Sequence, residues 1–170
     1  MEKPHFRVIE INSGNTVHSI QIGGKIDKMD YVKMTDEASG QLTETLRIID
    51  YKTGGKIKKP TNMYSLFMQD KDRANYVFQA FLYSWVMCAE EKRPISPLLF
   101  YVNHSSLPDY DPIVLFNGEQ VKDFKPLADD FENELRKLLE EQIFNPELPF
   151  KQTETKGACT FCDYKLFCGK

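Results

Sequence analysis

The sequence predicts an α/β fold with a mixed central β-sheet flanked by helices. Short segments of the first 52 residues alternate apolar and polar side chains, which is the period of a half-buried strand. Two later segments repeat apolar residues at helical spacing, and short apolar runs lie between them. The resulting order is three or four strands, a helix, further strand and a second helix, which predicts helices packed on a mixed sheet.

Length and composition indicate one soluble globular domain. The 170 residues are enough for one substantial core, and 41% hydrophobic with 28% charged residues excludes a disordered chain. The net charge of -3 gives no general attraction to nucleic acid, so a DNA-binding surface has to be local. No apolar stretch approaches the roughly 20 residues that span a bilayer, and the N-terminus lacks a signal-peptide core. We therefore expect a cytoplasmic protein without a membrane partner.

The pattern of the first third of the chain predicts four strands. The expected strands are 6–11, 16–22, 25–34 and 43–51. A strong turn signal at 12–15 joins the first two, Gly23-Gly24 permits a bend before the third, and 36–40 is a polar loop. Thr53-Gly54-Gly55 ends the fourth strand.

The remainder predicts two amphipathic helices and two short strands. The first helix is expected over 74–93, and Pro94 and Pro97 are expected to end it. Its apolar stripe consists of Phe78, Phe81, Leu82, Trp85 and Ala89. Strands are expected at 98–103 and 113–116, and a second helix at 125–142. We expect residues 1–145 to form the core of the domain. Residues 146–170 are expected to form a loop-like, cysteine-rich tail packed on the same domain.

An acid pair and a lysine carry the strongest chemical signal. Asp50 and Lys52 end an apolar run two residues apart, so they point together at roughly 6.6 Å along the strand, while Tyr51 faces the other side. Asp27 lies a hairpin's length upstream and is brought to the same edge. Two carboxylates beside an ammonium group suit a divalent-metal site that hydrolyses phosphodiesters.

Within that site we expect Asp27, Asp50 and the main-chain carbonyl of Tyr51 to bind Mg²⁺ or Mn²⁺. Lys52 would orient the attacking water or stabilise charge in the transition state. The alternative is a plain Asp50–Lys52 ion pair at a strand end. Burial of charge at the end of an apolar strand is costly, which favours the functional interpretation.

Two further sets of polar residues could belong to this site. Gln79 and Tyr83 are four apart and share one helix face, where they act either as boundary residues or as support and phosphate contacts. Lys56, Lys58 and Lys59 follow the predicted active strand and either bind DNA phosphates or form a solvated loop.

Three motifs together resemble the RecB-like branch of the PD-(D/E)xK nuclease superfamily. They are Gly24-Lys25-Ile26-Asp27, Ile49-Asp50-Tyr51-Lys52-Thr53-Gly54 and Gln79-Ala80-Phe81-Leu82-Tyr83. The resemblance implies a restriction-endonuclease-like core with Asp27, Asp50, Lys52, Gln79 and Tyr83 as catalytic residues. It also implies a metal-dependent deoxyribonuclease, often the C-terminal domain of a helicase–nuclease subunit that processes double-strand breaks.

The cysteine tail extends this resemblance. Cys159, Cys162 and Cys168 have a spacing that suits zinc or iron–sulfur, with free thiols as the alternative. The spacing is similar to the end of the iron–sulfur staple in AddB-type and CRISPR-associated members, whose fourth cysteine lies before the first strand. Cys88 is expected in the helix core instead. A [4Fe–4S] cluster is therefore possible only with a fourth cysteine from outside this chain, and we expect a C-terminal piece of a longer polypeptide, a genuinely short member being the alternative.

Several functions remain open at this level. The leading one is an exonuclease domain with a helicase partner in double-strand-break repair. The alternatives are a stand-alone CRISPR-associated or restriction-like nuclease, a catalytically decayed DNA-end-binding module, and a zinc-stabilised binding domain. Thr53-Gly54-Gly55-Lys56 lacks the spacing of a Walker phosphate loop, so no motor activity is expected of these residues.

Overall fold

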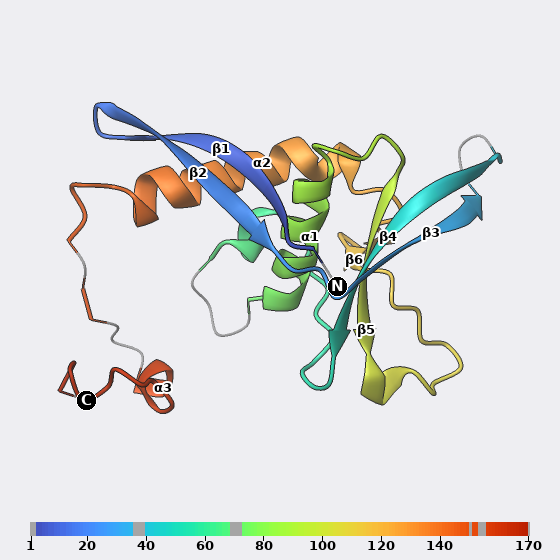
Figure 1. Ribbon diagram of the computed structural model, residues 1–170. Helices are drawn as coiled ribbons and strands as arrows, with labels where there is room; N and C mark the ends of the chain where they lie inside the picture. The colour runs from blue at the N-terminus through green and yellow to red at the C-terminus, as the bar shows by residue number, and fades with distance from the viewer. Residues whose placement is uncertain (1–2, 36–39, 69–72, 150, 153–155, 170) are drawn as a thin grey trace.

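The computed structural model describes residues 3–35, 40–68, 73–149, 151–152 and 156–169. The strands are β1 His5–Ser13, β2 Thr16–Gly24, β3 Lys28–Thr35, β4 Leu42–Lys52, β5 Ile95–Tyr101, β6 Leu115–Phe116 and β7 Glu119–Gln120. The helices are α1 Asn75–Met87, α2 Ala128–Lys137, which continues as a π-helical segment over Leu138–Ile143, and α3 Lys156–Cys159 (Figure 1).

The central sheet has the order β3-β4-β5. β3 runs antiparallel to β4, and β4 runs parallel to β5 with α1 as the crossover between them. β4 is the middle strand, which explains its apolar run: Leu46, Ile48 and Ile49 are all buried. The predicted mixed sheet flanked by helices is confirmed, and it places the end of β4 beside the end of β5.

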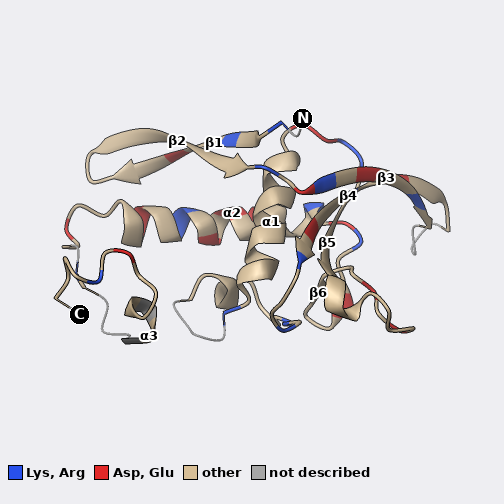
Figure 2. Ribbon diagram, turned by 60° about the horizontal axis from the view of Figure 1, so that its bottom comes forward, with Lys and Arg blue, Asp and Glu red and all other residues tan. Residues whose placement is uncertain are grey.

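The β1–β2 hairpin forms a separate two-stranded sheet. At its open end Gly23 pairs with Phe6 and has φ +156°, where a Cβ would lie 2.0 Å from the carbonyl oxygen of His5. Glycine is therefore required at this position. The hairpin lies over α1 and α2 in both overall views (Figures 1 and 2).

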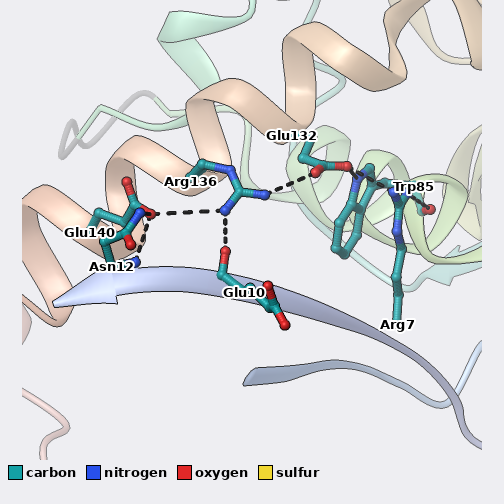
Figure 3. Close-up of polar contacts among 7 residues, drawn as sticks. All are labelled: Arg7, Glu10, Asn12, Trp85, Glu132, Arg136 and Glu140. Carbon is teal, nitrogen blue, oxygen red and sulfur yellow. Dashed lines mark hydrogen bonds and ion pairs between the residues drawn. The ribbon is translucent and has the colours of Figure 1, made fainter. Parts of the chain in front are cut away.

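A polar network attaches β1 to the helices, as Figure 3 shows. The Glu132 carboxylate of α2 accepts hydrogen bonds from Arg7 Nη2 at 2.8 Å, Trp85 Nε1 at 3.0 Å and Arg136 Nη2 at 3.2 Å. The Arg7 guanidinium also lies 4.2 Å from the Trp85 ring centroid. One carboxylate thus joins β1, α1 and α2.

Aromatic side chains form the core between α1 and α2. Phe81, Trp85, Phe124 and Phe131 are fully buried, and the Phe81 and Phe124 ring centroids are 5.0 Å apart. The predicted apolar stripe of the first helix therefore faces the core, apart from Ala89, which lies beyond the end of α1 and is exposed.

Several predicted boundaries were wrong. The first helix ends at Met87 instead of Arg93, because residues 88–90 form a turn and Pro94 precedes a strand. Pro97 does not end a helix: it lies buried within β5, which begins at Ile95 instead of Leu98. The strand expected at 113–116 is reduced to Leu115–Phe116, with Ile113 bridged to Leu98. The expected loop at 36–40 falls mainly on residues 36–39, outside the described part of the chain.

The tail beyond residue 145 contains the short helix α3 and a series of turns. The large apolar side chains described there are exposed, among them Phe161 at 95% and Phe167 at 92%. Gln152 Nε2 donates to the main-chain oxygen of Cys168 at 3.0 Å, a contact within the tail. The division into a core of 1–145 and a tail of 146–170 packed on it stays a prediction. Within the described residues no helix is both long and apolar enough to cross a bilayer.

Candidate active site

Asp50 lies near the end of β4, where its side chain points from the sheet toward α1. It is 3% exposed, which is rare for a carboxylate without a dedicated partner. The partner is Lys52, whose Nζ forms an ion pair with Asp50 Oδ2. The two residues share a face as the strand period requires, and Tyr51 lies on the other face against Phe100, with ring centroids 5.5 Å apart.

Helix α1 supplies the next contacts of Lys52. Lys52 Nζ donates to Gln79 Oε1 at 2.9 Å, and Gln79 Nε2 donates to the Tyr83 hydroxyl at 3.3 Å. The predicted pair of Gln79 and Tyr83 therefore meets the predicted lysine in one chain of hydrogen bonds. The crossover between β4 and β5 is what carries this helix face to the end of β4.

Asp27 lies in the bend directly before β3 and is exposed. Its Oδ2 accepts a hydrogen bond from the main-chain N–H of Tyr51 at 2.9 Å, so the bend is fastened to the end of β4. Asp27 is close enough to Asp50 for its charge to act on that carboxyl. The structure thus brings together both predicted acids, Lys52, Gln79 and Tyr83 at one edge of the sheet.

Burial raises the pKa of Asp50 above its ordinary value. The neighbouring Lys52 ammonium opposes this rise, and the Asp27 carboxylate adds to it. A buried acid with a second carboxylate beside it is a common arrangement where a cation is to be bound. Figure 2 shows acidic and basic segments next to one another at this end of the sheet, beside α1.

The residues present fit a divalent cation. Although Asp50 Oδ2 pairs with Lys52, it is buried and accepts no hydrogen bond of regular geometry from a described residue. A buried carboxylate oxygen with spare acceptor capacity, next to an exposed carboxylate, suits a hard cation that keeps several water ligands. No group of three or more His, Cys, Asp or Glu side chains in the described ranges is placed to hold a metal ion.

The contact between Tyr76 and Lys52 was not predicted from the sequence. The ring centroid of Tyr76 lies 4.3 Å from Lys52 Nζ. The signal was the position of Tyr76 three residues before Gln79, which places both on one face of α1. Only the structure shows that this face meets Lys52.

The three predicted DNA-binding lysines lie on the loop that follows β4. Lys56 and Lys58 line a pocket with Arg73, Tyr76 and Tyr101. Lys59 lines a neighbouring pocket that also includes Lys58 and Arg73. The basic loop is therefore adjacent to the helix that supports Lys52, and its role in binding DNA stays a prediction.

The cysteines of the tail are free thiols in the structure. Cys159 and Cys162 are partly exposed, Cys168 is exposed, and they are not grouped for a metal ion among the described side chains. Cys88 is partly buried, and burial raises the pKa of its thiol to about 11, as expected of an unreactive core cysteine. The iron–sulfur assignment of the three tail cysteines stays a prediction.

Comparison with known proteins decides the family. The family model described as "PD-(D/E)XK nuclease superfamily" matches residues 1–169. The chain belongs to this superfamily. Neither the curated proteins nor the solved structures compared with it gave a significant match.

Membership explains the geometry just described. The mixed sheet β3-β4-β5 with its flanking helices is consistent with the restriction-endonuclease-like core of this superfamily, so the predicted fold class is confirmed. Members of the PD-(D/E)XK superfamily are typically metal-dependent nucleases that use Mg²⁺ or Mn²⁺ and act on DNA. The branch within the superfamily is a separate question.

Proposed function

We propose that this chain is a deoxyribonuclease that hydrolyses phosphodiester bonds with Mg²⁺ or Mn²⁺ bound between Asp27 and Asp50. The observation that carries the proposal is the buried Asp50 carboxylate, which is paired with Lys52 and has a second acid, Asp27, beside it. A structural ion pair alone would not require a second acid at this place. The main-chain carbonyl of Tyr51 completes the proposed set of protein ligands.

Each residue of the proposed site has a separate role in the reaction. When bound, the cation neutralises charge on the phosphate and lowers the pKa of a bound water. Asp50 and Asp27 hold the cation, and the hydrogen bond from Tyr51 N–H to Asp27 keeps the exposed acid at the end of β4. Lys52 places a positive charge where charge develops in the transition state, and Gln79, itself bonded to Tyr83, fixes its ammonium.

The RecB-like branch is our proposal for the finer class. Its support is that Lys52 of the Asp-Tyr-Lys-Thr-Gly stretch and Gln79 of the Gln-x3-Tyr pair meet at 2.9 Å, as one functional unit would require. On that basis the activity is an exonuclease in double-strand-break repair, with a helicase domain or subunit as partner, in the cytoplasm. Lys56, Lys58 and Lys59 would bind the DNA backbone, and Cys159, Cys162 and Cys168 would supply three ligands of an iron–sulfur cluster completed from outside the chain.

Cleavage of a labelled single-stranded oligonucleotide with Mg²⁺ or Mn²⁺ tests the nuclease proposal. We expect metal-dependent cutting by the wild type and by Asp109→Ala, an exposed acid that is not among the proposed ligands, and none by Asp50→Ala. Wild-type protein that binds the oligonucleotide without cutting it would favour the decayed end-binding module instead. A circular single strand then tests the exonuclease assignment, because an exonuclease leaves it intact and an endonuclease cuts it.

A further inference from the structure

Lys52 is held by three side chains, and the proposed reaction accounts for only two of them. Its ammonium pairs with Asp50 and donates to Gln79 at 2.9 Å. The third contact is the Tyr76 ring, whose centroid lies 4.3 Å from Nζ. An ammonium group at this distance from an aromatic ring is attracted by the negative electrostatic potential of its face.

The placement of Tyr76 follows from helix geometry. Tyr76, Gln79 and Tyr83 lie at positions i, i+3 and i+7 of α1, so they occupy one face of the helix. That face is carried to the end of β4 by the crossover. A single helix face therefore contacts Lys52 twice, once by a hydrogen bond and once by a ring.

The Tyr76 ring is itself held from two sides. On the loop after β4, Gly55 has φ +97°, and a Cβ there would lie 2.7 Å from Tyr76 Cε2. The loop backbone therefore approaches the ring too closely for any side chain but hydrogen. On β5, the ring centroid of Tyr101 lies 6.3 Å from that of Tyr76, and the two ring planes are inclined at 56°. Tyr101 itself is buried, with 3% of its surface exposed.

Tyr101 in turn fastens the same loop. Its hydroxyl donates to the main-chain oxygen of Lys56 at 3.3 Å, directly after Gly55. The loop, the buried ring of Tyr101 and the Tyr76 ring thus form one packed unit. Tyr76 is 37% exposed, so its contacts with Gly55 and Tyr101 are what limit its movement away from Lys52.

We propose that Tyr76 is a positioning residue for Lys52, and that Gly55 is glycine so that the Tyr76 ring can stay against the ammonium group. The proposal rests on the assigned role of Lys52 in the nuclease reaction. Tyr76 acts on the reaction through Lys52: its ring restricts the positions of the ammonium, and Gln79 orients it. The hydroxyl of Tyr76 has no part in this role, so phenylalanine can replace it.

The contact is tested by nuclear magnetic resonance without any need for activity. Protons above an aromatic ring shift upfield, so the ε-methylene signal of Lys52, assigned by its loss in Lys52→Ala, reports the ring. We expect an upfield-shifted signal in the wild type and in Tyr76→Phe, and an ordinary position in Tyr76→Leu and Gly55→Ala. An unshifted signal in the wild type, or a signal that stays shifted in Tyr76→Leu, would overturn the proposal.

Steady-state kinetics test the consequence for the reaction. Tyr76→Leu is expected to lower kcat about 10-fold with KM within about 2-fold, which is the range that a partly desolvated cation–π contact supports. Tyr76→Phe should restore kcat, and Tyr64→Leu, an exposed tyrosine elsewhere, should leave it unchanged. Full activity of Tyr76→Leu would contradict the positioning role. Absence of cleavage in the wild type itself would instead reject the nuclease proposal, and the resonance experiment would still decide the contact.

Discussion

At the scale of single residues, the buried ion pair of Asp50 and Lys52 adds little to stability but serves the proposed reaction. Asp50 is buried and its pKa is raised by that burial, and the ion pair with Lys52 opposes this rise. An ion pair this buried contributes little net stability compared with a packed apolar pair. Its presence is best explained by the chemistry it permits.

Lys52→Ala should therefore lower the cleavage rate by at least roughly 100-fold, because the positive charge that stabilises the transition state is lost. Binding of Mn²⁺ should persist, since both carboxylates remain. Cleavage rates and calorimetric titration with Mn²⁺, measured on protein whose circular dichroism matches the wild type, separate the two effects. Unchanged cleavage would remove Lys52 from the mechanism.

The sequence could predict the part of this site that depends on the periods of a strand and a helix. The shared face of Asp50 and Lys52 follows from the strand period, and the shared face of Gln79 and Tyr83 follows from the helix period. Tyr76 could not be assigned in this way. Its role depends on which helix face the crossover brings to β4, and this is a property of tertiary packing.

At the scale of elements, Glu132 is the residue on which the attachment of the β1–β2 hairpin depends. It accepts hydrogen bonds from Arg7 of β1, Trp85 of α1 and Arg136 of its own helix (Figure 3). Hydrogen bonds that involve a charged group contribute roughly 1.5–3 kcal/mol each, and they are not additive.

Glu132→Ala is thus expected to lower the free energy of unfolding by about 2–4 kcal/mol. Glu134→Ala is the matched control on the same helix. Within the described part of the chain Glu134 pairs with Lys137, an exposed side chain on the same helix, so its loss should change stability by less than about 0.5 kcal/mol. Urea denaturation measures both. Equal effects of the two substitutions would show that the network does not attach the hairpin.

A second element-scale contact gives the protein an acid-sensitive junction between β3 and the start of β5. Glu91 accepts hydrogen bonds from Arg93 and from the Tyr31 hydroxyl, and these lower the pKa of Glu91 from 4.5 to about 2. A depressed carboxyl pKa stabilises the folded state above the unfolded pKa, and this stability is lost as the pH falls through the folded pKa.

Stability should accordingly decline between pH 4.5 and about 2, in part through Glu91. Glu91→Gln should flatten this part of the profile. Glu90→Gln should change it much less, because Glu90 is exposed and its ion pair with His5 is long, at 3.9 Å. Melting temperatures recorded across this pH range provide the check. A profile of Glu91→Gln that parallels the wild type would contradict the assignment.

The elements themselves were predicted unevenly. The strand period located β1, β2 and β4 well, since β1 and β4 have buried positions and β2 alternates half-buried Ile20 and Ile22 with exposed residues. The end of α1 and the start of β5 were misplaced, because an apolar segment with two prolines fits either the end of a helix or a buried strand. That β1 and β2 form a sheet of their own depends on contacts with α1 and α2, which local pattern does not encode.

At the scale of the whole molecule, the parallel pair β4–β5 and the crossover helix between them explain why the site lies where it does. Both strands end at the same edge of the sheet, and the bend before β3 adds Asp27 to that edge. The exposed apolar side chains and cysteines of the tail are not part of this arrangement. The residues proposed for the nuclease chemistry therefore all lie before residue 146.

The most direct test of this account is calorimetric titration of Mn²⁺ into the wild type, Asp27→Asn, Asp50→Asn and Asp109→Asn. We predict one site in the wild type and in Asp109→Asn, and binding at least roughly 10-fold weaker in the other two variants, since each loses a carboxylate ligand. Wild-type affinity in Asp27→Asn and Asp50→Asn would show that these acids do not hold the cation, and the proposed site would be wrong.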